Sequence, residues 1–155
     1  MKKILLFISF SLLFAEGNLC SLLPDNIGNY SSYEKCKSVN IQTDTVKGEQ
    51  AYKEYKKNNK NISLQILKGG PSYQFISVFS MPLTVNTDET FISTTTCKKL
   101  KCAVTYAKKE HNGIIVVMLD KKIPAVLVFT FENMKPDEVV KILNKVDIQK
   151  IKNNL

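Results

Sequence analysis

Residues 113–131 read GIIVVMLDKKIPAVLVFTF, and this stretch decides the fold. Ile114 begins six consecutive apolar residues, a length that suits a buried strand and is short for a helix. Three polar residues, Asp120, Lys121 and Lys122, separate this run from a second one. The sequence therefore predicts a hairpin of two strands. Because both strands are apolar on both faces, they should lie at the centre of a sheet or be covered on both sides.

The residues after the hairpin predict an amphipathic helix. Pro136 suits the first helical turn, and the carboxylates of Asp137 and Glu138 favour a helix N-terminus. Apolar residues then recur at helical spacing, at Val139, Val140, Leu143 and Val146. We expect this helix to lie on the sheet and cover the central hairpin.

The rest of the chain predicts further, shorter strands. These are expected at residues 34–43, 62–66, 91–96 and 102–109. Residues 50–57 fit a strand or a helix, and the strand is preferred because a polar turn precedes residues 62–66. Residues 73–79 fit a strand or a short helix. The predicted fold class is α+β, a mostly antiparallel sheet of five to seven strands in a hairpin meander, covered by the C-terminal amphipathic helix.

Residues 1–17 have the pattern of a cleavable signal peptide. Two lysines precede an apolar run that is short for a membrane span, and small residues follow at Ala15 and Gly17. Cleavage at either small residue, lipidation at Cys20 and an uncleaved anchor all stay open. Residues 18–155 are then expected to form a single small exported domain, periplasmic or secreted, with membrane contact only through an uncleaved leader.

The four cysteines, Cys20, Cys36, Cys97 and Cys102, all follow the leader. An even count in a short exported chain indicates disulfides. Proximity in the sequence favours Cys20–Cys36 and Cys97–Cys102, although the other two pairings stay possible. Lysines beside the second pair leave open a redox-active dithiol. The spacings are not those of zinc ligands, so neither a metal site nor a cofactor is predicted.

The charged residues are unusual because every basic one is a lysine. The chain has 22 Lys+Arg against 14 Asp+Glu, a formal net charge of +8, and it contains no arginine. Arginine is the favoured side chain for planar, bidentate recognition of phosphate or carboxylate, so its absence argues against such a site and against nucleic-acid binding. The single histidine, His111, falls in a predicted turn, where it lacks the partners of a catalytic triad. No catalytic residue is predicted.

The lysines become suggestive once the meander is taken into account. Turns at residues 98–101 and 120–122 fall at the same end of it. They bring together a "basic tip" of five residues, Lys98, Lys99, Lys101, Lys121 and Lys122. Such a tip could dock an acidic envelope protein, an anionic lipid or a glycan. Alternatively, the lysines provide solubility and protect strand edges.

These observations predict a non-catalytic exported binding or interaction module of unknown ligand, with the basic tip as its docking surface. Two alternatives stay open. One is a periplasmic thiol-disulfide enzyme that uses Cys97 and Cys102, and the other is a structural subunit of a cell-envelope assembly.

Overall fold

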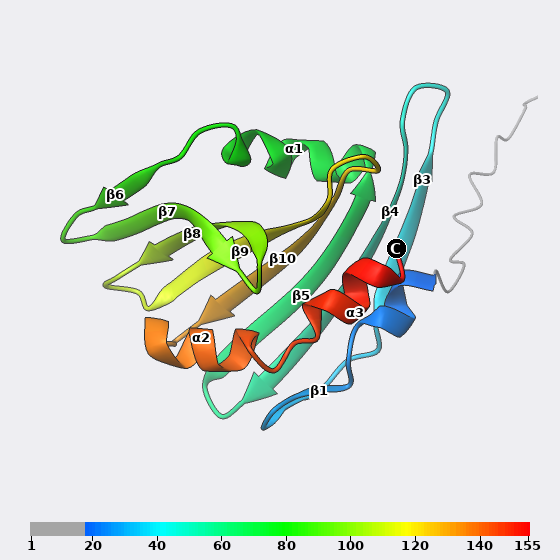
Figure 1. The fold of residues 1–155 in the computed structure, drawn as a ribbon. Helices are drawn as coiled ribbons and strands as arrows, with labels where there is room; N and C mark the ends of the chain where they lie inside the picture. Colours follow the sequence, from blue (N-terminus) through cyan, green and yellow to red (C-terminus); the bar gives the residue numbers. More distant parts are fainter. Residues whose placement is uncertain (1–17) are drawn as a thin grey trace, which may run out of the picture.

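The computed structural model describes residues 18–155, so the predictions about residues 1–17 lie outside the described residues. Ten strands form one antiparallel sheet (Figure 1). The strands are β1 (Asn26–Ile27), β2 (Tyr30–Ser32), β3 (Lys37–Gln42), β4 (Lys47–Lys57), β5 (Lys60–Gly69), β6 (Thr84–Asn86), β7 (Thr90–Cys97), β8 (Leu100–Ala107), β9 (Asn112–Asp120) and β10 (Ala125–Glu132).

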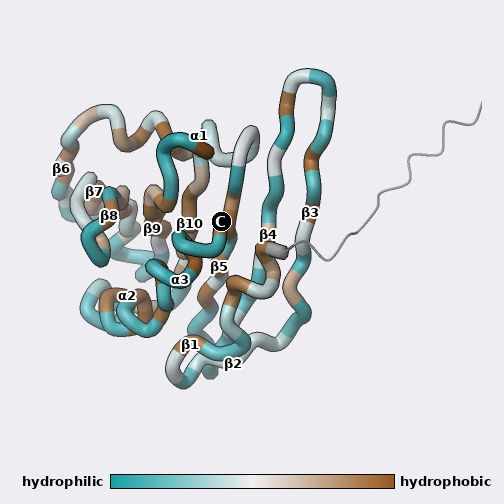
Figure 2. The backbone as a smooth tube through the Cα atoms, turned by 45° about the vertical axis from the view of Figure 1, so that its right-hand side comes forward, coloured by the Kyte–Doolittle hydropathy of each residue, from teal (hydrophilic) through white to brown (hydrophobic). Residues whose placement is uncertain are grey.

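The sheet order is β1-β2-β4-β5-β10-β9-β8-β7-β6, and β3 pairs with β4 on the same edge as β2. The hairpin β9–β10 therefore lies near the middle, as its two apolar faces predict. Figure 2 shows hydrophobic stretches along β5, β9 and β10. The β4–β5 hairpin confirms the preference for a strand at residues 50–57, and β3 confirms the predicted edge strand.

The predicted fold class is wrong in its strand number and in its covering layer. Residues 18–155 contain ten strands instead of five to seven, because β1, β2 and β6 are too short to show an alternating apolar pattern. No single helix among residues 18–155 covers the sheet. On the concave face lie α2 (Pro136–Leu143), α3 (Ile148–Asn153) and η1 (Asn18–Leu22), which together contribute Val139, Ile148 and Leu19 to the main core. The fold is mainly β with small helices.

The outer face of the sheet has its own cover, which the sequence left undefined. It consists of η2 (Gly70–Ser72), α1 (Tyr73–Ile76) and η3 (Ser77–Phe79), so residues 73–79 are helical. Figure 1 shows α1 on the side of the sheet opposite α2 and α3. Phe75 and Phe79 pack there against Val126 and Val128 of β10, while Leu127 and Phe129 face the main core. This explains why β10 is apolar on both faces.

Both disulfides have the predicted pairing. Cys20–Cys36 joins η1 to the residue before β3, and Cys97–Cys102 crosses the β7–β8 turn. Two disulfides in a chain of this size are typical of an oxidising, exported environment. No helix within residues 18–155 is long and apolar enough to cross a membrane.

Candidate functional site

The β7–β8 turn carries the first lysines of the predicted tip. Lys98 and Lys99 both have positive φ, 48° and 70°, as the two central residues of a tight hairpin turn require. The Lys98 ammonium donates hydrogen bonds to the carbonyl oxygens of Asn144, at 3.0 Å, and Val146, at 2.6 Å. These carbonyls follow the C-terminal end of α2, where a positive charge is favourable. Lys98 therefore holds α2 against the turn, while Lys99 stays exposed.

The β9–β10 turn carries the remaining lysines and is held against η2. The carbonyl of Pro124 accepts hydrogen bonds from the Gly69 amide, at 2.7 Å, and from the Ser72 hydroxyl, at 2.9 Å. The Asp120 carboxylate accepts from the amides of Lys122 and Ile123, which lowers the pKa of Asp120. Because the backbone is held on both sides, the turn presents its side chains in a fixed place.

Helix α3 connects the two turns. The Gln149 side chain donates to the Lys98 carbonyl at 3.2 Å, and the charge of Lys152 contributes to lowering the pKa of Asp120. The strand register agrees, since Cys102 pairs with Val117 and both turns lie at the same end of β8 and β9. We call this region the basic end. Its exposed lysines are Lys99, Lys101, Lys121, Lys122 and Lys152.

Sequence reasoning missed Lys152 because only tertiary packing brings α3 beside the hairpin turns. It also counted Lys98, whose ammonium is bound to two backbone carbonyls.

One apolar side chain interrupts the lysines. Ile123 directly follows Lys122 and is 57% exposed, although isoleucine is normally buried.

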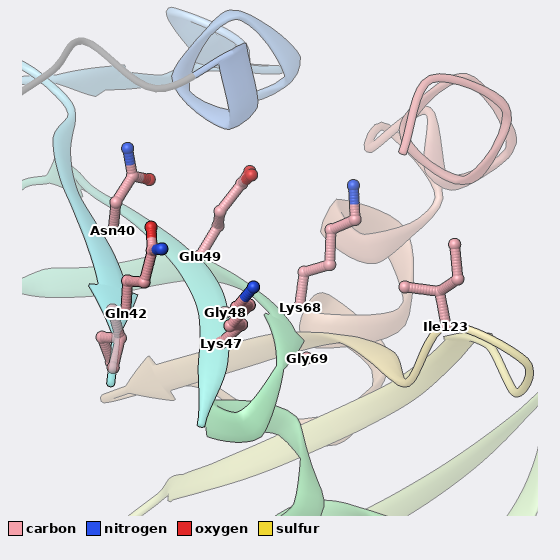
Figure 3. A pocket seen from close by; sticks show the side chains of 9 residues that line it. Asn40, Gln42, Lys47, Gly48, Glu49, Lys68, Gly69 and Ile123 are labelled. Carbon is pink, nitrogen blue, oxygen red and sulfur yellow. The ribbon is translucent and has the colours of Figure 1, made fainter. Parts of the chain in front are cut away.

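A hollow of about 390 Å³, whose lining residues include Lys47, Glu49 and Lys68, borders the basic end (Figure 3). Figure 3 shows Asn40, Glu49 and Lys68 extending from neighbouring strands toward the same side, with Ile123 at the rim. Glu49 and Lys68 are cross-strand partners, and the Lys68 ammonium donates to the backbone carbonyl oxygen of Leu155 at 2.6 Å. Lys68, one of the charged residues that line the hollow, thus joins residue 155 to β5.

Two apolar cavities lie on opposite faces of the sheet. The first, of about 340 Å³, lies between α2 and the strands β7 to β10, and its lining includes Val104, Tyr106 and Leu143. The second, of about 520 Å³, lies on the outer face beneath α1 and η3, and its lining includes Phe75, Ala103 and Val116. Both volumes fall within the roughly 300–1,000 Å³ of small-molecule sites. No feature of the sequence pattern predicted either cavity.

The groups considered for catalysis are placed as follows. The His111 Nδ1 atom forms a hydrogen bond with the Tyr106 hydroxyl at 2.8 Å, and His111 itself is exposed in a turn. Cys97 and Cys102 are bonded to each other, and Cys102 is fully buried. Within residues 18–155 no cluster of three or more His, Cys, Asp or Glu residues is arranged to hold a metal ion.

The fold and the site thus define a class: a mainly antiparallel, disulfide-bonded sheet protein with lysines gathered at one end. No family model matches the chain, and neither the curated proteins nor the solved structures include a match to it.

Proposed function

We propose that this protein is an exported, non-catalytic binding module that docks on an anionic lipid surface through its basic end. The observation that carries the proposal is the position of α3, which places Lys152 beside the two lysine-bearing turns. Each lysine close to an anionic bilayer contributes about 1 kcal/mol of attraction. The five exposed lysines of the basic end are therefore enough for reversible docking.

Two features favour lipid over an acidic protein or a glycan. Lysine is a hydrated point charge without the planar fork of arginine, so it suits a diffuse surface charge better than a fixed pattern of carboxylates. Ile123 is exposed beside Lys121 and Lys122, where it can enter the headgroup region of a bilayer. A sulfated or acidic glycan offers no apolar partner for this side chain. This proposal adds a second membrane contact to the one expected through an uncleaved leader.

Export is part of the same proposal. The leader-like residues 1–17 and the two disulfides support it, and cleavage of the leader and a periplasmic location are proposed with it. Intact-mass measurement of the protein from its native compartment, with alkylation before and after reduction, tests this part. A mass that retains residues 1–17, or thiols that are alkylated before reduction, would contradict it.

Docking is tested by co-sedimentation of the protein with two kinds of vesicle, one of phosphatidylcholine alone and one that also contains phosphatidylglycerol. The test variant replaces Lys99, Lys101, Lys121 and Lys122 with Ser. At about 1 kcal/mol per lysine, its binding to the anionic vesicles should fall by more than about tenfold. Unchanged binding would overturn the basic end as the site, and equal binding to both vesicles would overturn the electrostatic mechanism.

The matched control replaces four other exposed lysines with Ser and so changes the net charge equally. These are Lys35, Lys56, Lys135 and Lys141. Its binding should stay within about twofold of the natural protein, because the attraction declines within a Debye length of the surface. If the control loses as much binding as the test variant, net charge rather than the basic end is responsible.

A further inference from the structure

The segment 73–83, which we call the roof, covers a cavity of about 520 Å³ on the outer face of the sheet. Side chains of Phe75 and Val78 line it from the roof, and side chains of Ala103, Ile114 and Val116 line it from the sheet. None of the lining residues carries a charge, whereas 23% of the chain is charged. The lack of charge therefore indicates what kind of molecule the cavity can hold.

The cavity exists because the sheet has small side chains there. Under one part of the roof, Phe75 and Phe79 fill the space above Val126 and Val128. Over β7 and β8 the lining side chains include those of Thr94, Ala103 and Thr105, which are too short to fill the gap. Protein interiors are otherwise packed densely, and apolar cavities bind apolar molecules rather than water.

The far end of the roof is attached to the sheet mainly through Thr94. Its hydroxyl accepts a hydrogen bond from the Leu83 amide at 2.8 Å, and its amide donates to the Leu83 carbonyl at 2.9 Å. Met81 is 71% exposed, and Val78 and Leu83 are also exposed at the rim of the cavity. Exposed apolar side chains around an apolar cavity mark a site of interaction.

We infer that the roof cavity binds a single hydrocarbon chain with an uncharged polar head, such as a long-chain alcohol or a monoacyl ester. The apolar side chains of Phe75, Ile114 and Val116 would contact the chain. Ser77, Ser80 and Thr105 lie among the lining residues, and their hydroxyls can bond a neutral head. A carboxylate head finds no cation in the lining, so a fatty acid should bind more weakly than the corresponding alcohol.

This inference does not rest on the docking of the basic end, and the two can fail separately. Binding is measured on the full chain with N-phenyl-naphthylamine, an uncharged apolar probe whose fluorescence rises in an apolar site. Decanol should displace the probe at a lower concentration than decanoate. No probe binding, or more effective displacement by decanoate, would overturn the inference.

Two adjacent positions on β8 give a matched pair of variants. Ala103 lines the roof cavity, whereas Val104 lines the cavity beneath α2. Ala103→Phe should fill the roof cavity and weaken probe binding by about tenfold or more, while Val104→Phe should leave it within about twofold. The opposite result would assign the ligand to the α2 cavity and overturn the inference.

A second measurement needs no substitution and so remains decisive even if a variant fails to fold. The methionine methyl groups are labelled with ¹³C, and decanol is added. Met81 lines the roof cavity, whereas Met134 is buried in the main core on the other face. The Met81 methyl resonance should shift and that of Met134 should not. An unchanged Met81 resonance at saturating decanol would overturn the inference.

Discussion

The two faces of this sheet are covered in very different ways. On the concave face, helices, short strands and a disulfide enclose a large core, and ion pairs such as Lys60–Glu138 and Lys53–Asp25 join the cover to the sheet. On the outer face, the roof rests on four buried side chains and leaves a cavity beside them. The comparison indicates that the concave face provides most of the stability of the fold. The outer face can therefore contain a cavity without unfolding the protein.

The largest expected difference between the faces comes from truncating one phenylalanine on each. Phe129 is fully buried in the main core, whereas Phe75 is partly buried under the roof. Phe129→Ala should lower the free energy of unfolding by about 3–5 kcal/mol. Phe75→Ala should lower it by about 1 kcal/mol, because the roof can open locally. Denaturant unfolding followed by circular dichroism measures both, and equal losses would contradict the comparison.

The next largest effect concerns the disulfides, both of which border the main core. Cys20–Cys36 spans a sequence separation of 16 and Cys97–Cys102 a separation of 5. In the chain-entropy description, removing the first by a double Cys→Ala change should cost about 3 kcal/mol and removing the second about 2 kcal/mol. Unfolding measurements compare the two variants. The folded form of each should keep the probe affinity of the roof cavity, and a loss of that affinity would mean that the faces are coupled.

The sequence predicted the parts of this fold that depend on local pattern. The central hairpin, the edge strand β3 and both disulfides follow from apolar runs, turns and cysteine spacing. The strands β1, β2 and β6, of two or three residues, become strands only by pairing with longer neighbours, so their own residues contain no pattern.

The basic end was predictable only in part, for a related reason. Lys121 and Lys122 lie in a turn whose place in the meander follows from the order of the strands. Lys152 belongs to the basic end because α3 packs beside the two turns. Lys98 is not one of its free lysines because its ammonium binds two carbonyl oxygens that follow α2. Both are contacts between residues distant in sequence, which periodicity does not reveal. The cavities depend in the same way on side-chain volumes across layers.

A smaller effect is expected from the ion pair that joins α2 to the sheet. The Glu138 carboxylate accepts hydrogen bonds from the Lys60 ammonium, at 2.7 Å, and from the Tyr30 hydroxyl, at 3.0 Å. These bonds lower the pKa of Glu138, with Lys60 as the main cause. Because the pKa is lower in the folded state, the stabilisation is present above the unfolded pKa of about 4.3 and is lost as the pH falls through the folded pKa.

Glu138→Gln should therefore lower the free energy of unfolding at neutral pH by about 0.5–1 kcal/mol, since the pair is partly exposed. The difference between variant and natural protein should shrink toward zero in acid, below the pKa of the folded carboxyl group. Urea unfolding over a series of pH values measures it. The charge-matched control is Glu110→Gln, in an exposed turn. A difference that persists unchanged in acid would show that the ionised carboxylate is not responsible.

The smallest effect has the opposite sign and concerns a strained turn beside α2. Lys99 has a φ of 70°, a conformation that costs a non-glycine residue about 1 kcal/mol or more and glycine almost nothing. Lys99→Gly should therefore raise the free energy of unfolding by about 0.5 kcal/mol, because the relief of strain is partly offset by the greater freedom of glycine in the unfolded chain.

The control is Lys101→Gly, which lies within β8, where glycine should instead lower the free energy of unfolding by about 0.5–1 kcal/mol. Both variants remove one lysine of the basic end, so their vesicle binding should fall equally while their stabilities move apart. A destabilised Lys99→Gly protein would mean that the Lys99 side chain contributes contacts that outweigh the strain of its backbone.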